Sequence, residues 1–186
     1  MVSSENSNNK ETHIAFLRGI NMIGQKTMKM ETLKSTFESL GLYNVKTILA
    51  SGNVIFDSEK SSGLSLSEMI ENKLEQKLSY KVSVVIRSIN EIRELVSSKP
   101  FKRIIVSPRT KLLLTFLSEK PISKIKTPFE SSEKDFKILR VSDNEVYSVV
   151  TLLPNKHTSG LMSFLEKEFG KKITTRNWNT ILKCLK

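Results

Sequence analysis

Hydrophobic and polar positions along the first half of the chain predict four strands and three helices. Short apolar runs between turn residues are typical of buried strands, and apolar residues three and four apart are typical of one helix face. The predicted strands are 14–17, 45–49, 54–56 and 82–86. The predicted helices are 30–40, 66–78 and 89–96, the second opened by a capping box at Ser65 to Glu68. The resulting order, β-α-β-β-α-β plus a trailing helix, is that of a ferredoxin-like unit.

A similar order recurs in the second half of the chain. Strands are predicted at 112–117, 136–141, 146–150 and 173–175, and helices at 121–125, 161–169 and 178–185. We therefore expect an α+β fold of two ferredoxin-like (βαββαβ) halves in tandem, packed as one compact unit. The expected segments are a disordered tail at 1–11, an N-terminal ferredoxin-like half at 12–99, a basic, proline-containing connection at 100–110 and a C-terminal α+β half at 111–186.

Positive charge is concentrated at the predicted connection. The 186-residue chain has a net charge of +11, and eight basic residues but only one acid, Glu119, lie between Lys99 and Lys126. Such a field attracts anions, so nucleic acid or a nucleotide-like molecule is the expected partner. The alternative is that the charge only keeps the protein soluble. The residues assigned to this patch are Lys99, Lys102, Arg103, Arg109 and Lys111.

Several classes of protein are disfavoured by composition. No apolar run approaches the roughly 20 residues of a membrane span, so no membrane partner is expected. The polar N-terminus lacks the basic and apolar regions of a secretory signal. Cys184 is the only cysteine, which excludes an intrachain disulfide and suits a reducing compartment. A cytoplasmic protein without an obligate protein partner is the expectation.

The loop from Gly19 to Thr27 has the place but not the spacing of a phosphate-binding P-loop. It follows a strand and precedes a helix, but Lys26 comes one residue too late after Gly24. The predicted sheet is also not the parallel kind that holds such loops, so an ATPase is excluded. Two interpretations remain, an anion-friendly corner at a helix N-terminus and a tight turn that the glycines allow.

Four segments together point to a known family. They are 17–21 (Leu-Arg-Gly-Ile-Asn), 28–41, 51–56 (Ser-Gly-Asn-Val-Ile-Phe) and 175–180 (Thr-Arg-Asn-Trp-Asn-Thr). In this order they resemble the bacterial domain-of-unknown-function family 1697 (DUF1697), over nearly all of the chain after the tail. The resemblance implies a soluble α+β protein with no established activity, so it transfers no catalytic residues. The chain departs from the family pattern at Ile23, Gln25, Leu49 and Ala50.

Polar residues within these segments form the candidate ligand site. Each has a local explanation, since Ser51 and Asn53 suit a turn and Asn177 suits a helix N-cap. The functional hypothesis is that the segments meet at one polar surface where guanidinium groups and amides bind an anionic ligand. The candidate residues are Arg18, Asn21, Lys26, Ser51, Asn53, Arg176, Asn177 and Asn179.

Signals of catalysis are weak. The only histidines are His13, expected near the surface, and His157, and with one cysteine they offer no zinc-like spacing. A Gly-x-Ser-x-Gly nucleophile elbow is missing, and Cys184 is expected to be a small buried side chain. No catalytic residue, metal or cofactor is assigned, and the sequence favours a protein that is not an enzyme.

Aromatic residues give little support to a standard RNA-recognition module. Such modules stack bases on aromatics of two central strands. Here those strands offer only Phe16 and Phe56, both expected in the core under the helices. Trp178 is likewise expected in the core. Three functions therefore stay open: binding of an anionic ligand without catalysis, an enzyme acting on a small anionic substrate, and a protein-interaction module.

Overall fold

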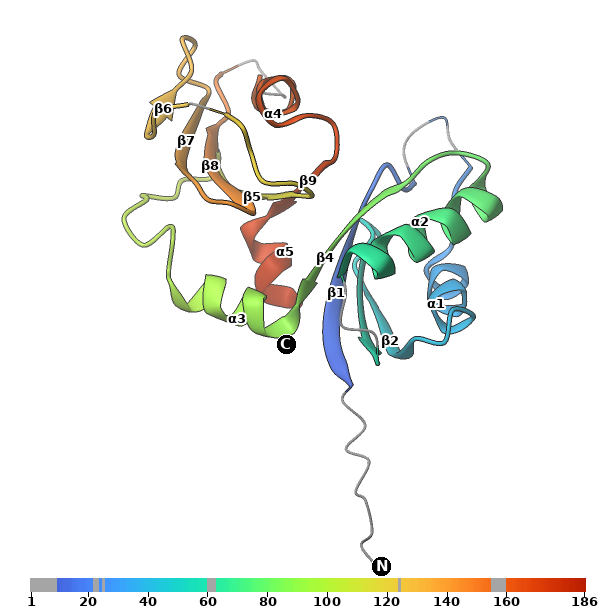
Figure 1. The fold of residues 1–186 in the computed structure, drawn as a ribbon. Helices are drawn as coiled ribbons and strands as arrows, with labels where there is room; N and C mark the ends of the chain where they lie inside the picture. The colour runs from blue at the N-terminus through green and yellow to red at the C-terminus, as the bar shows by residue number, and fades with distance from the viewer. Residues whose placement is uncertain (1–9, 22–23, 25, 60–62, 124, 155–159) are drawn as a thin grey trace, which may run out of the picture. The chain divides into compact units, whose positions relative to one another are not determined.

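The structure, a computed structural model, has two compact units, Met1–Asn90 and Glu91–Lys186 (Figure 1). It describes residues 10–21, 24, 26–59, 63–123, 125–154 and 160–186. Within this part of the chain two antiparallel sheets and five helices form. The tail predicted at 1–11 falls almost wholly outside the described residues, and Glu11 already belongs to the first strand. The predicted segments 12–99, 100–110 and 111–186 stay predictions.

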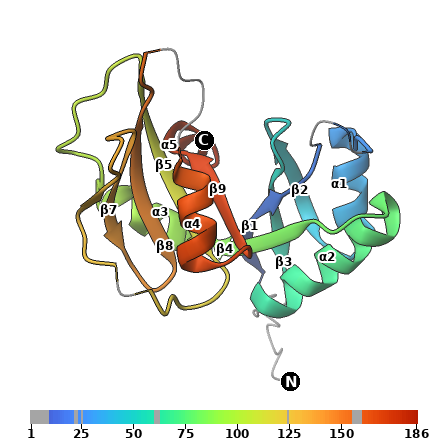
Figure 2. The ribbon, with the colours of Figure 1, turned by 90° about the horizontal axis from the view of Figure 1, so that it is seen from above.

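The first unit has the predicted β-α-β-β-α-β order. Its sheet runs β2-β3-β1-β4 and is built from β1 (Glu11–Arg18), β2 (Tyr43–Ile48), β3 (Asn53–Ser58) and β4 (Ser83–Ser88). Helices α1 (Met30–Glu38) and α2 (Gly63–Leu78) lie on one face of it (Figure 2). The capping box predicted at Ser65 to Glu68 is wrong, because α2 begins at Gly63 and Ser65 is already inside the helix.

The core of the first unit follows from the two-residue period of β1. Ala15 and Leu17 point to the helices, where α1 contributes Phe37 and α2 contributes Ile70. The ring of Phe37 meets that of Phe56 edge-on, with 5.5 Å between centroids. The same period turns His13 inward, so the expectation that it lies near the surface is wrong: the residue is 3% exposed and its ring contacts that of Phe56.

The second unit contains a five-stranded sheet in the order β6-β7-β8-β5-β9. Its strands are β5 (Thr110–Leu117), β6 (Phe129–Glu130), β7 (Phe136–Val141), β8 (Glu145–Thr151) and β9 (Ile173–Asn177). Its helices are α3 (Ile89–Ser97), which begins in the last two residues of the first unit, α4 (Leu161–Phe169) and α5 (Trp178–Lys183). Leu161 and Leu165 of α4 pack on one face of the sheet against Ile138 and Val150.

The tandem arrangement of two ferredoxin-like halves is not confirmed. The strand order β7-β8-β5-β9 repeats the order β2-β3-β1-β4 of the first unit. However, the described residues between Pro121 and Ile125 form no helix, and Lys124 lies outside them. Ser123 instead donates a hydrogen bond to Glu168 while Ile125 packs on the core. A helix of one turn is marginal in water, because its nucleation fixes several backbone dihedral angles for a single hydrogen bond.

Phe16 and Phe56 are both fully buried, as expected for core residues. Only Phe56 lies under the helices, because Phe16 alternates with Ala15 and Leu17 and so points to the opposite face of the sheet. Among the described residues no helix is both long and apolar enough to cross a bilayer.

Candidate functional site

The basic segment after α3 is held in place by one aromatic side chain. Phe101 is 7% exposed, meets the indole of Trp178 edge-on at 5.0 Å and lies 6.1 Å from the ring of Tyr147. Two tight turns surround it, in which the N–H of Lys102 donates to the carbonyl of Lys99 and the N–H of Ile104 donates to that of Phe101. Burying Phe101 therefore fixes the backbone from which its basic neighbours project.

The side chains of the predicted basic patch are exposed and carry unneutralised charge. Lys99, Lys102, Arg103, Arg109 and Lys111 all lie on the surface. None of them forms an ion pair with a carboxylate of the described residues, whereas Lys120 pairs with Asp143 at 2.9 Å and Lys137 with Glu130 at 3.5 Å. Within the part of the chain that the structure describes, an external anion at the patch therefore meets no competing carboxylate.

A shallow pocket opens beside this patch, and we call it the Trp178 pocket. Its volume is about 420 Å³, within the range of small-ligand sites. Two of its lining residues are basic and six are apolar or aromatic. They are Lys99, Lys102, Val96, Pro100, Phe101, Leu112, Trp178 and Leu182. The arrangement offers an apolar surface for a flat group with ammonium groups beside it.

Trp178 is the functional candidate that the sequence did not identify. It is half-buried and lines the pocket, whereas its helical spacing with Ile181 and Leu182 predicted a core position. It also stands at the first position of a helix of six residues, between the exposed Asn177 and Asn179. That polar flanking is the one signal in the sequence that favours a partly exposed ring.

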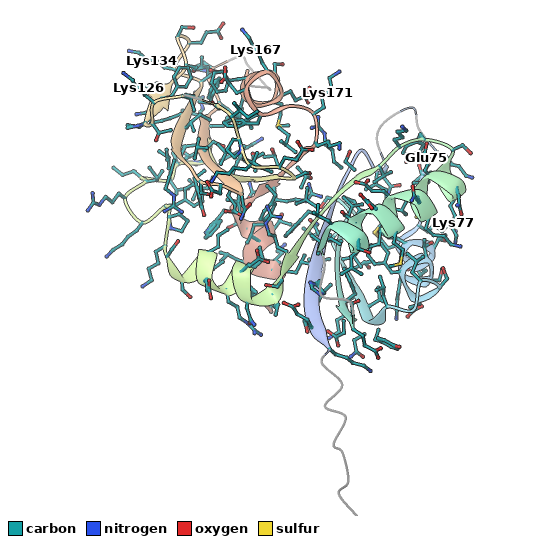
Figure 3. The ribbon with its side chains drawn as sticks, viewed as in Figure 1. Glu75, Lys77, Lys126, Lys134, Lys167 and Lys171 are labelled. Atoms are coloured by element: carbon teal, nitrogen blue, oxygen red, sulfur yellow. The ribbon has the colours of Figure 1, made fainter. Side chains whose placement is uncertain are left out.

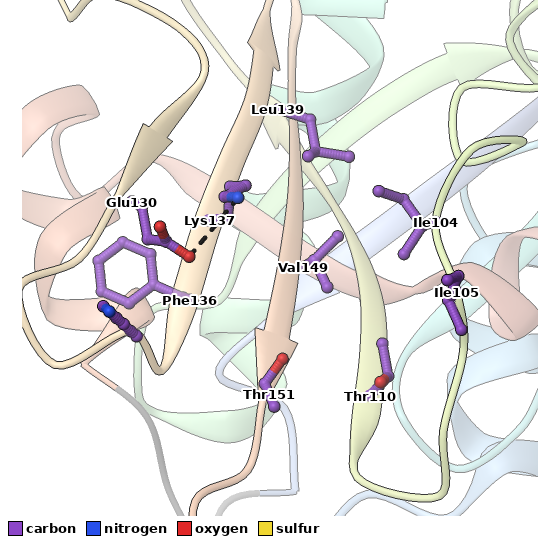
Figure 4. A pocket seen from close by; sticks show the side chains of 10 residues that line it. Ile104, Ile105, Thr110, Glu130, Phe136, Lys137, Leu139, Val149 and Thr151 are labelled. Atoms are coloured by element: carbon purple, nitrogen blue, oxygen red, sulfur yellow. Dashed lines mark ion pairs between the residues drawn. The ribbon is translucent and has the colours of Figure 1, made fainter.

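A second pocket, the Ile104 pocket, has a volume of about 210 Å³ (Figure 4). Ile104 and Ile105 of the basic segment line it together with residues of β5, β6, β7 and β8. Its charged lining residues are Lys134 and the Lys137–Glu130 ion pair. It combines apolar surface with cationic groups, as the Trp178 pocket does, but it also carries a carboxylate.

The two pockets lie next to each other on one face of the sheet. Leu112 lines the Trp178 pocket, Val149 lines the Ile104 pocket, and these residues are direct partners across β5 and β8. The basic segment contributes to both, since Lys102 and Ile104 are two residues apart and their Cα atoms are within about 7 Å. Arg103 stands between them in the chain and is exposed.

The candidate residues of the β1–α1 loop are engaged in holding that loop together. The Asn21 side chain accepts a hydrogen bond from the N–H of Met28 at 2.7 Å and donates one to its carbonyl at 3.0 Å. Nζ of Lys26 donates to the carbonyl of Lys77 at the end of α2, which Figure 3 labels. The hydroxyl of Tyr80 donates to the carbonyl of Lys26. These bonds tie the described part of the loop to Met28 and to the end of α2, and both interpretations of the loop stay predictions.

The β2–β3 turn is built in the same way. Asn53 is fully buried, and its amide donates to the carbonyl of Ile48 and to the hydroxyl of Ser51. The carbonyl of Gly52 accepts a hydrogen bond from the N–H of Leu17 at 2.8 Å. Arg18, the last residue of β1, is half-buried beside this contact. Two of the three candidate segments thus adjoin within the first unit.

The third candidate segment belongs to the second unit. Asn177 is the N-cap of α5, as predicted, because its side-chain oxygen accepts a hydrogen bond from the N–H of Asn179. The Arg176 guanidinium donates to the hydroxyl of Thr174 and to the carbonyl of Thr175, both at 2.9 Å. That Arg176 lies close to Arg18 and Ser51 at one surface stays a prediction.

Titratable groups near α5 are shifted by burial. Burial lowers the pKa of Arg176 to about 10, so its guanidinium is charged at neutral pH. Burial raises the pKa of the Cys184 thiol to about 11, and this holds the sulfur in its unreactive form. Burial also raises the pKa of Tyr147, against the opposing effect of the Arg140 guanidinium above its ring. None of these shifts produces a nucleophile or a general base at neutral pH.

Further lysines surround the sheet of the second unit. Figure 3 shows Lys126, Lys134, Lys167 and Lys171 on this unit, around β6 and α4. All four are exposed. Among the residues that the structure describes, no group of three or more His, Cys, Asp or Glu side chains is placed to hold a metal ion. The described part of this unit therefore offers cationic and apolar surface rather than a metal centre.

Comparison with known proteins agrees with the fold and leaves the function open. A family model described as "Protein of unknown function (DUF1697)" matches residues 11–147. The structure of the conserved bacterial protein SP0830 from Streptococcus pneumoniae is similar, with a TM-score of 0.69 and 19% sequence identity. The similarity covers 94% of this chain and 96% of that one. No curated protein matches the sequence.

Proposed function

Because this chain belongs to the DUF1697 family of proteins of unknown function, no activity comes with its membership, and we propose from its own residues that it binds nucleic acid without catalysis. One observation carries the proposal. Five exposed basic side chains without carboxylate partners among the described residues lie between Lys99 and Lys111, and two of them, Lys99 and Lys102, line an apolar pocket. Phosphate groups supply the negative charge, and bases supply the flat apolar surface.

The two other hypotheses have less support. An enzyme acting on a small anion needs a general base beside Arg18 or Arg176, and the described residues supply no such group with a suitably shifted pKa. An interaction module is favoured by the exposed Ile105 and Val106, but these flank basic residues and one lines the Ile104 pocket. We further propose a cytoplasmic location, where nucleic acid is available and Cys184 stays reduced.

Salt dependence measures the proposed electrostatic contacts. Three to five phosphates neutralised by the patch should lower the affinity for single strands roughly 20- to 130-fold between about 50 mM and 200 mM salt. The measurement is fluorescence anisotropy of a labelled oligonucleotide added to the purified protein. Substitution of Lys102, Arg103 and Arg109 by Gln should weaken binding and flatten the salt dependence.

A matched control separates the patch from net charge. Lys29, Lys46 and Lys81 are exposed lysines of the first unit, and their replacement by Gln lowers the net charge by the same amount. We expect the control variant to bind within about twofold of the unmodified protein. Equal losses in both variants would show that only overall charge matters, and absence of binding at low salt would overturn the proposed function.

A further inference from the structure

We infer that the Trp178 pocket binds an unpaired nucleobase, so that the protein recognises nucleic acid in single-stranded form. This inference rests on the proposed function and adds to it the conformation of the nucleic acid and the point of contact. The first argument is the indole itself. Trp178 is half-buried, and its ring is fixed by the edge-on contact with Phe101, at 5.0 Å and 70° between planes.

A fixed, partly exposed indole is a suitable stacking platform. Stacking on aromatic rings tolerates any base sequence, because every base has a π face. Inside a duplex both faces of each base are covered by neighbouring pairs, so away from the duplex ends only an unpaired or extruded base presents a face to the indole. The remaining apolar lining, which includes Leu112 and Leu182, offers apolar surface for the rest of a flat ring.

Charge complementarity fits the phosphates on either side of such a base. Lys99 and Lys102 both line the pocket, and the hydrogen bond from the N–H of Lys102 to the carbonyl of Lys99 holds their backbones in one turn. Their side chains are compact charges on flexible stems, which suits phosphates whose positions vary. An uncharged apolar ligand would leave both ammonium groups unused.

The neighbouring Ile104 pocket offers a second combination of apolar surface and positive charge to a bound nucleic-acid strand. Arg103 follows Lys102, and the Ile104 pocket begins at the next residue. A nucleic-acid strand with one base at Trp178 therefore meets Arg103 and then the Ile104 pocket on the same face of the sheet. A duplex cannot separate its bases over two adjacent pockets without unpairing.

Intrinsic fluorescence tests the contact directly, since Trp178 is the only tryptophan in the chain. The probes are a short oligouridine, an oligothymidine of equal length and a blunt duplex of the same number of phosphates. We expect both single strands to quench Trp178 emission and to bind at least about tenfold more tightly than the duplex. Replacing Trp178 by Leu should weaken single-strand binding roughly 5- to 150-fold, and Trp178→Phe should keep most of it.

The outcomes separate the two levels of the proposal. Single-strand binding without quenching, or equal affinity for duplex, overturns the inference and leaves the proposed function standing. Absence of binding to all three probes at low salt overturns both. If Trp178→Leu fails to fold, the quenching of the unmodified protein and the Trp178→Phe variant still decide the matter.

Discussion

Leu112 and Val149 face each other across β5 and β8, and each lines a different pocket. This pairing places the Trp178 pocket and the Ile104 pocket side by side on the sheet face opposite α4. The basic segment, whose Phe101 is buried and whose Ile105 is 93% exposed, borders both pockets. Substitutions should therefore be able to remove the contacts of a bound nucleic-acid strand in one pocket without removing those in the other.

Ile105→Glu should weaken binding of oligonucleotides but not of a single nucleotide. The substitution adds a carboxylate to the Ile104 pocket, where it repels a neighbouring phosphate. This repulsion should lower the affinity for oligonucleotides roughly threefold at low salt. A mononucleotide held only at Trp178 should bind as before. The control is Ile122→Glu, which changes an isoleucine of the same unit that is 94% exposed and lines neither pocket. Equal effects of the two changes, measured by anisotropy, would exclude the second contact.

Gly52→Ala should destabilise the first unit more than Gly41→Ala. Both glycines have positive φ, 73° and 76°, so both substitutions carry backbone strain of about 1 kcal/mol. A Cβ at Gly52 would lie 2.6 Å from Cγ2 of Ile20 and 3.0 Å from Cβ of Leu17, whereas a Cβ at Gly41 meets nothing within 4 Å. Overpacking should add about 1–3 kcal/mol to the loss for Gly52→Ala. Urea unfolding measures the difference, and equal losses would contradict the close approach of the turn to β1.

Asn21→Ala should lower stability by about 1–3 kcal/mol without changing affinity for oligonucleotides. The substitution removes both hydrogen bonds between Asn21 and the backbone of Met28, and places alanine at a φ of 56°. Asn72→Ala is the control, because Asn72 is an exposed residue inside α2 where alanine is favourable. Urea unfolding and anisotropy are measured on both variants. Loss of affinity in a folded Asn21→Ala protein would return this loop to the candidate binding residues.

The pH dependence of stability should reveal the buried thiol of Cys184. Burial raises its pKa from 9.0 to about 11, so between these values the unfolded chain loses a proton that the folded chain keeps. The unfolded state therefore binds fewer protons, and the free energy of unfolding falls as pH rises, by about 1 kcal/mol between pH 8 and pH 10. Below pH 8 the thiol contributes no slope.

Cys184→Ala isolates this effect from the titration of other groups. The variant is less stable at every pH, but its decline between pH 8 and pH 10 should be smaller than that of the unmodified protein by the same amount. An aromatic disulfide reagent should also modify the thiol only when the protein is unfolded. Rapid modification of the native protein would contradict the burial of Cys184.

Local patterns in the sequence determined most of the elements. The apolar run before Arg18, the stripe ending at Gly41 and the polar turn around Gly52 each predict a structure that forms from neighbouring residues, and each is present. The non-helical backbone around Ile125 and the short β6 were not predicted. Their conformations depend on distant partners, Glu168 and β7 respectively.

For the candidate site, too, some features follow from the sequence and others only from the tertiary structure. Sequence alone determined that positive charge gathers between Lys99 and Lys111, because the order of the residues fixes where charges lie along the chain. Tertiary structure decided which residues accompany that charge. Trp178 reaches the pocket through its contact with Phe101, 77 residues earlier in the chain, and Leu112 meets Val149 only through the register of β5 and β8. Such long-range pairings arise from packing of the whole unit, and no local pattern specifies them.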